Sequence, residues 1–298
     1  MMDSIEKYLA FIGGIRRYSP RTVSLYRDSL EAFTGFAGDA PASLSVTSVR
    51  EWEVYLLEER SMSATTVGMH LSILSGFCRY LMGQGLLESN PVRMVKRPKT
   101  PKRLPTFYRE ESMKEYFDSH KGTLEFGSYE PALRYMIVSL LYSTGLRRAE
   151  LIGLDRSSFD EARRVLHVHG KGDKMRDIPL CEETIAEISL YLQRVERELD
   201  APQDGPLLLT PSGTRLYPMF VERAVKRELD GVSGISVRKS PHVLRHTIAS
   251  ELLDRGSDLN SIKEMLGHSS LSATQIYTHN SIEKLKRVYT EAHPRAKK

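Results

Sequence analysis

Cysteine is scarce in this chain of 298 residues, which has only Cys78 and Cys181. Two isolated cysteines exclude a disulfide framework and a zinc site built on paired cysteines, so both are expected to be small packing residues. Long apolar runs are also lacking, since no stretch reaches the roughly 18 apolar residues of a membrane span. The N-terminus has no apolar core of the signal-peptide type. We therefore expect a cytoplasmic protein with no membrane partner.

The excess of positive charge is small, with 43 Lys and Arg against 38 Asp and Glu. A net charge of +5 is too small to indicate a nucleic-acid partner, and its distribution is more informative. Residues 93–103 carry six basic side chains and no acidic one. Such a stretch suits contact with a phosphate backbone by counterion release, although a solvated charged linker is the alternative interpretation.

The N-terminal part of the chain is predicted to form a bundle of amphipathic helices. The first is expected near residues 3–12, and the second has Ser19 as N-cap with Pro20 at its first position. Thr47 is expected to cap a third helix, and Ser63 precedes a fourth. Apolar residues recur at three- and four-residue steps in these helices. They are Val23, Tyr26, Leu30, Phe33 and Ala37, then Val49, Trp52 and Leu56, then Val67, Leu71, Leu74, Cys78 and Leu81.

A domain boundary is predicted just after this bundle. Asn90-Pro91 ends the helical region, because the residue before a proline disfavours helix. Residues 98–105 hold three prolines and three basic side chains, which is typical of a linker. The chain is long enough for two domains with separate cores. We predict an N-terminal helical domain at 1–97, a basic linker at 98–105 and a second domain at 106–298.

The second domain is predicted to be mainly helical with a small antiparallel sheet, so that the fold class is α+β. Val165–His169 alternates like a strand, and Asp177–Leu180 resembles its partner. Gly170–Lys174 would then form the turn between them. Arg147 is expected at a turn, with Glu150 beginning the next short helix. Helices are expected at 109–120, 131–142, 183–199, 217–229, 241–254 and 258–267.

Six side chains suited to holding and cutting a phosphodiester without a metal lie between residues 147 and 277. Arginine supplies planar donors that match phosphate oxygens, and histidine can donate or shuttle protons. A tyrosine hydroxyl can serve as nucleophile, and it must lose its proton during the attack or be activated by nearby cations. The six are Arg147, Lys171, His242, Arg245, His268 and Tyr277.

In their order and setting, these residues resemble the active site of the tyrosine recombinases, the DNA strand-exchange enzymes also called the integrase family. The shared motifs are Thr-Gly-Leu-Arg with a following Glu-Leu, Gly-Lys-Gly, His-x-Leu-Arg-His, Leu-Gly-His-Ser-Ser and Ile-Tyr-Thr-His. Residues 18–22, Asn90-Pro91 and residues 289–296 are similar to the Xer branch, whose members resolve chromosome dimers. The resemblance implies a two-domain clamp on DNA, with an N-terminal core-binding domain of SAM-like fold and a C-terminal catalytic domain.

The resemblance implies that Tyr277 attacks the scissile phosphate to give a 3'-phosphotyrosyl link and a free 5'-hydroxyl. No metal, cofactor or ATP is needed, because the energy stays in the covalent bond. By position, Tyr142 and Tyr289 are the rival nucleophiles. Lys171 would protonate the leaving 5'-oxygen, and Lys174 in the same turn is its alternative.

The other roles follow from the same resemblance. Arg147 and Arg245 would stabilise the charge of the phosphorane, because preorganised cationic donors suit that task. His268 would donate to a phosphate oxygen, and His242 would accept a proton or organise the site. Glu150 would position other groups and take no part in the reaction.

Several neighbouring residues are expected to have lesser roles. Arg148 is predicted to face the surface or DNA, and His246 to pack structurally. His167 and His169 share one face of a strand at a spacing that could bind a metal, but no third ligand is evident.

The implied partners are a double-stranded recombination site and further protomers, which act as a tetramer of one protein or two on two duplexes. A four-way junction would form between the strand exchanges, and a septal DNA translocase could be a further partner. Segment 281–298 is expected to dock on the next protomer, as the resemblance implies, although packing on its own protomer is the alternative interpretation. The alternatives are an integrase or transposase of a mobile element, a type IB topoisomerase and a non-catalytic DNA-binding module. The target sequence cannot be derived from the chain, because base readout depends on a few side chains.

Overall fold

The computed structural model describes residues 1–99, 107–170, 174–199, 204–235, 238–267 and 294–295. The chain divides into two compact units, Met1–Arg103 and Leu104–Lys298, and this division falls inside the predicted linker. None of the helices in the described ranges combines the length and the apolar character that a membrane crossing needs.

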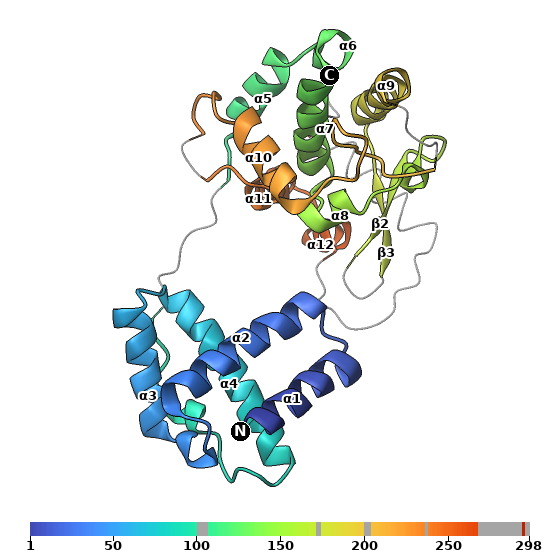
Figure 1. The fold of residues 1–298 in the computed structure, drawn as a ribbon. Helices are drawn as coiled ribbons and strands as arrows, with labels where there is room; N and C mark the ends of the chain where they lie inside the picture. The colour runs from blue at the N-terminus through green and yellow to red at the C-terminus, as the bar shows by residue number, and fades with distance from the viewer. Residues whose placement is uncertain (100–106, 171–173, 200–203, 236–237, 268–293, 296–298) are drawn as a thin grey trace. The chain divides into compact units, whose positions relative to one another are not determined.

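The N-terminal unit is a bundle of helices (Figure 1). Ser19 caps α2 as predicted, and Ser63, which was predicted to precede a helix, caps α4. In each case the serine hydroxyl accepts a hydrogen bond from the amide three residues later. The predicted first helix is α-helical at its start and continues as a π-helical turn at Phe11–Ile15. The helices are α1 Met2–Ala10, α2 Pro20–Ala37, α3 Val46–Val54 and α4 Ala64–Gly83.

One predicted cap in this unit is wrong. Helix α3 begins after Ser45, whose hydroxyl accepts the Ser48 amide at 3.1 Å, and Thr47 lies inside the helix. Serine and threonine both cap helices, so the sequence offers two competing starts two residues apart. The apolar face was placed correctly, since Trp52 is fully buried and packs edge-to-face on Phe33 with ring centroids 5.0 Å apart.

The C-terminal unit is built around helix α7, Tyr129–Thr144, which is buried on nearly all sides. A helix that is apolar all round belongs in the middle of a core, and α7 packs against α9, α10 and α11 (Figure 1). The other helices are α5 Glu110–Ser119, α6 Thr123–Phe126, α8 Arg148–Ile152, α9 Glu182–Glu198, α10 Pro218–Glu228, α11 Pro241–Asp254 and α12 Leu259–Leu266.

The sheet of this unit has three antiparallel strands in the order β1-β2-β3. Strand β2, Val165–His169, has the predicted bounds, whereas β3 is Met175–Pro179 and so begins two residues before the expected start. The ladder extends to the pair His169–Met175, next to the predicted turn. The short strand β1, Phe159–Asp160, was not predicted, because two residues are too few to show alternation.

The predicted fold class is confirmed: the described residues are mainly helical with one small antiparallel sheet. Most predicted helices of the second unit differ from those observed by one or two residues at an end. Helix α6 was missed because four residues carry no periodic signal.

Candidate functional site

The Thr-Gly-Leu-Arg motif forms the sharp turn between α7 and α8. Gly145 ends α7 with φ +62°, a left-handed conformation that glycine adopts without strain. Leu146 is fully buried and fixes the turn to the core. Arg147 lies at this turn, as the sequence predicted, and is the N-cap residue of α8. The helix begins at Arg148, two residues before the predicted start at Glu150. The Arg147 side chain is about one-third exposed.

Glu150 holds Arg147 in place at this turn. Its carboxylate accepts the Arg147 amide at 2.8 Å and the Arg147 Nη1 at 2.7 Å. Glu150 is buried, and acceptance of the N-cap amide by a side chain three residues later is half of a capping box. The predicted positioning role of Glu150 agrees with this geometry.

Helix α11 carries the His-x-Leu-Arg-His motif. Arg245 is buried, whereas His242 and His246 lie one turn apart on an exposed face of the helix. The structural packing predicted for His246 is therefore wrong. The buried face of the helix passes through Val243 and Leu244 instead.

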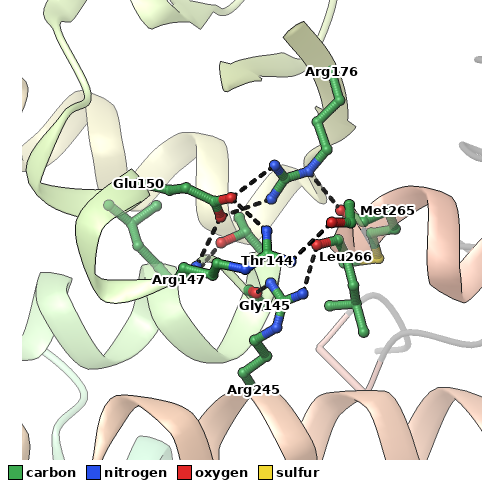
Figure 2. A network of polar contacts seen from close by, with 10 residues as sticks. Thr144, Gly145, Arg147, Glu150, Arg176, Arg245, Met265 and Leu266 are labelled. Carbon is green, nitrogen blue, oxygen red and sulfur yellow. Dashed lines mark hydrogen bonds and ion pairs between the residues drawn. The ribbon is translucent and has the colours of Figure 1, made fainter. Parts of the chain in front are cut away.

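The end of α12 is where these elements meet, as Figure 2 shows. Three successive main-chain carbonyls at this end each accept a hydrogen bond from a different arginine. The bonds are Arg176 Nε to Met265 O at 2.9 Å, Arg245 Nη2 to Leu266 O at 2.5 Å, and Arg147 Nη2 to Gly267 O at 2.8 Å. The last carbonyls of a helix have no partner within the helix, so the arginines satisfy them. Arg245 also donates from Nη1 to Gly145 O at 2.6 Å, which ties α11 to the turn before Arg147.

Arg176, on β3, is a member of this cluster that sequence reasoning missed. Its guanidinium forms a two-pronged ion pair with Glu150, with Nη1 to Oε1 at 3.0 Å and Nη2 to Oε2 at 2.9 Å. A usable signal existed in strand alternation, because Arg176 shares the inward face of its strand with Ile178. An inward-pointing arginine requires a buried partner.

The electrostatics of the cluster suit an anion. Burial and the neighbouring Arg147 lower the pKa of Arg245 to about 10, so that its guanidinium is still charged at neutral pH. Burial opposes ionisation of Glu150, yet the hydrogen bonds from Arg176 and from the Arg147 amide hold its pKa below the usual range. Arg147 and Arg245 therefore repel each other at a site where a bound phosphate would relieve the repulsion.

Tyr142, one of the rival nucleophiles, has its hydroxyl hydrogen-bonded within the core of the unit. It is buried in α7 and its hydroxyl donates to Glu251 Oε2 of α11 at 2.6 Å. Burial and the nearby Glu251 raise the pKa of Tyr142 well above its usual range. A phenol in this setting is a poor nucleophile, because its ionised form is disfavoured.

Glu251 itself should make the stability of this unit pH-dependent. Burial raises its pKa to about 7, the Tyr142 hydrogen bond opposes this, and Glu110 adds to it. Below about pH 4.5 the carboxyl is protonated in both the folded and unfolded states, and between pH 4.5 and 7 only the unfolded state ionises. The stability that the raised pKa contributes is therefore lost as pH rises through about 7.

Glu251→Gln should remove this dependence. Between pH 4.5 and 8, we expect the unfolding free energy of the unsubstituted protein to fall by about 3 kcal/mol relative to that of the variant. Urea unfolding across this range measures the difference. Glu182→Gln is the control, since Glu182 pairs with Arg164 at the surface and should show a far smaller change. Parallel curves for Glu251→Gln and the unsubstituted protein would contradict the expectation.

Three of the six predicted site residues, Lys171, His268 and Tyr277, lie outside the described residues, as does the rival Tyr289. Of the other three, the structure brings Arg147 and Arg245 to one helix end, and His242 lies on α11 one turn before Arg245. Lys174 is exposed, and its carbonyl accepts the Gly170 amide at 2.7 Å.

Arg148 and His167, which were expected to have lesser roles, bond to nearby carboxylates. Arg148 is partly exposed and pairs with Glu222 at 2.6 Å. His167 Nδ1 bonds Asp177 at 2.6 Å, and within the described residues no group of three potential ligands could hold a metal ion.

Comparison with known proteins places the chain in a family. Residues 117–284 match the phage integrase family, and residues 5–85 match the N-terminal SAM-like domain of phage integrases. A tyrosine recombinase XerC from Alcanivorax borkumensis is 35% identical over 100% of this chain and 95% of its own length. Another XerC, from Chlorobaculum parvum, is 33% identical over 98% of this chain and 94% of its own length.

Solved structures agree on the fold. The Tn1549 transposon integrase, in complex with transposon right end DNA, superposes with a TM-score of 0.71 at 18% identity. The superposition covers 96% of this chain and 98% of that one. The arginine cluster, the family matches and the XerC relatives lead to one conclusion: the chain belongs to the phage integrase family, and within it to the tyrosine recombinases of Xer type.

Proposed function

We propose that this recombinase resolves chromosome dimers by exchanging strands between two copies of one DNA site. The XerC relatives that match it over nearly its full length support this role. On this proposal the protein acts in the cytoplasm on double-stranded DNA, as four protomers of one or two kinds on two duplexes. A septal DNA translocase would be a further partner.

The observation that carries the chemistry is the meeting of Arg147 and Arg245 at the end of α12. His268 follows directly in the sequence, so the phosphate would be held between these arginines and that histidine. Tyr277 would attack the phosphorus and form the 3'-phosphotyrosyl bond as the bond to the 5'-oxygen breaks. Lys171 would give that oxygen its proton, and the freed 5'-hydroxyl of the partner strand would reverse the reaction.

Mapping the bound DNA in the organism's own genome tests the biological role. A single chromosomal site near the replication terminus is expected, and a nicked duplex that carries it should trap a covalent protein–DNA adduct. Sites at the ends of mobile elements would instead indicate an element-borne integrase. Relaxation of supercoils by one protomer without site preference would indicate a topoisomerase.

We further propose that segment 281–298 docks on the next protomer. In the single chain, Arg295 contacts its own unit: Nη1 donates to Ser139 Oγ at 2.7 Å and Nη2 bonds Glu187 at 2.5 Å. Its guanidinium also lies 4.1 Å from the centroid of the Phe117 ring. A neighbouring protomer has the same Ser139, Glu187 and Phe117 and could bind Arg295 in the same way. If each protomer gave its segment to the next, few contacts would therefore be lost.

Deleting residues 281–298 should therefore separate two kinds of binding. Half-site affinity should stay within about threefold, whereas cooperative occupancy of the paired site should fall. Gel-shift titrations of half and full sites measure both, and deletion of residues 296–298 alone is the control. Equal weakening on both DNAs, or loss of folding by circular dichroism, would show that the segment belongs to the core of its own unit.

A further inference from the structure

Arg176 is a buried charge that the proposed reaction does not use. Its side chain on β3 is 5% exposed, and all three guanidinium nitrogens donate hydrogen bonds, two to Glu150 and one to Met265 O. A buried ion pair of this kind is weak evidence for stability, because the cost of desolvation offsets much of the attraction. Its best-attested use is to hold parts of a structure in register.

The surroundings of Arg176 show which parts it holds. A Cβ atom added to Gly267 would lie 3.1 Å from Arg176 Nη1, and one added to Gly170 would lie 3.4 Å from it. The guanidinium therefore lies against the main chain of both glycines. Gly170 directly precedes Lys171, and Gly267 directly precedes His268.

Glu150 extends this contact to a third segment. The four donors on its carboxylate are two nitrogens of Arg176, the Arg147 amide and Arg147 Nη1. Two carboxylate oxygens offer about four lone-pair sites, so this acceptor is fully used. Without Arg176, half of these donors would be lost, and Arg147 would remain as the partner of a buried carboxylate.

We propose that Arg176 is a positioning residue for strand cleavage, which sets the spacing between Gly170, the residue before Lys171, Gly267, the residue before His268, and Arg147. The inference rests on the proposed function, because it assigns the three segments their roles in that reaction. Arginine is required because its planar fork makes two parallel bonds to a carboxylate and still donates from Nε. A lysine would keep the charge but lose the geometry.

The test compares two nicked duplexes that carry the mapped site, one with the natural 5'-oxygen at the scissile bond and one with 5'-sulfur. Sulfur leaves without a proton, so the second duplex does not need Lys171. Arg176→Lys should form covalent adduct about a hundredfold more slowly on the oxygen duplex, as small misplacements of reacting groups do. Half-site affinity should stay within about threefold.

On the sulfur duplex, Arg176→Lys should form adduct about tenfold faster than on the oxygen duplex. The sulfur removes only the share of the rate loss that comes from a misplaced Lys171. Lys171→Ala is the reference for full rescue. The matched control is Arg194→Lys, because Arg194 is also buried and donates to the main-chain carbonyls of Glu125 and Gly127 on another side of the unit. If Arg176 had a purely structural role, Arg176→Lys would lower the rate of adduct formation by the same factor on both duplexes. Arg194→Lys would then show an equal loss.

A double-mutant cycle keeps the test valid if a single variant folds poorly. Arg176→Met leaves the buried Glu150 carboxylate with only the two donors of Arg147, and adding Glu150→Gln removes that buried charge. If Arg176 acts through Glu150, the cleavage losses of Glu150→Gln and Arg176→Met should be strongly non-additive in the double variant.

Additive losses, equal losses on both duplexes, or cleavage by Arg176→Lys within about threefold of the unsubstituted rate would each overturn the inference. If the unsubstituted protein forms no adduct on either duplex, the proposed function fails, and the inference fails with it.

Discussion

Replacing Tyr277 with phenylalanine should abolish the covalent protein–DNA adduct while leaving DNA binding intact. The substitution removes only the hydroxyl, which is the atom proposed to attack phosphorus. The measurement is denaturing electrophoresis after incubation with a nicked duplex that carries the mapped site, with half-site binding followed in parallel.

Two other tyrosines serve as controls for this experiment. Tyr142→Phe should keep forming adduct, because that hydroxyl is buried and donates to Glu251. Tyr289→Phe should also keep it if the motif assignment is right. An adduct that persists in Tyr277→Phe and disappears in Tyr289→Phe would move the nucleophile to the later position.

Removing the guanidinium of Arg147 or Arg245 should slow cleavage by about a hundredfold or more with a much smaller change in affinity, as loss of one preorganised donor does. Arg245→Lys should be nearly as damaging as alanine. The reason is that two different guanidinium nitrogens of Arg245 donate to Gly145 O and Leu266 O, and a single ammonium group cannot reproduce that geometry. Single-turnover cleavage and half-site titration measure the two quantities.

Arg148→Ala is the matched control for the two arginines. It stands next to Arg147 in the chain but pairs with Glu222, so cleavage should stay within about threefold. Equal losses of affinity and cleavage in Arg147→Ala would assign that arginine to DNA binding. A loss in Arg148→Ala as large as in Arg147→Ala would mean that the motif has been aligned one residue out of place.

Local signals predicted much of the fold from the sequence alone. Ser19 with Pro20 and Ser63 marked helix starts because a hydroxyl before an apolar-periodic segment has one strongly favoured use. The same rule failed at Thr47, because Ser45 competes for the same role two residues earlier. The strand pair was recognised by alternation, while the pairing of Met175 with His169, which starts β3 two residues before the predicted start, was not predicted.

The candidate site was predictable only as separate motifs. Arg147 and Arg245 were singled out from the residues around them, but nothing local shows that both reach the end of α12. Arg176 was passed over because its importance lies in partners 26 residues upstream and 89 residues downstream, at Glu150 and Met265. His246 was misjudged for a related reason: which face of α11 is buried is decided by tertiary packing, and the helix has little amphipathic pattern of its own.

The three arginine bonds to the end of α12 also bear on how this site can vary during evolution. Every amino acid offers the same main-chain carbonyl oxygen, so the acceptors at Met265 and Leu266 do not depend on the identity of the side chain. The three arginine donors cannot be substituted in this way, because no other side chain has the length and the planar donor geometry of a guanidinium. Met265 and Leu266 are buried, so relatives should tolerate exchanges between apolar side chains at these two positions far better than any substitution at the arginines that bond to them, and a saturation library scored for recombination would show that asymmetry.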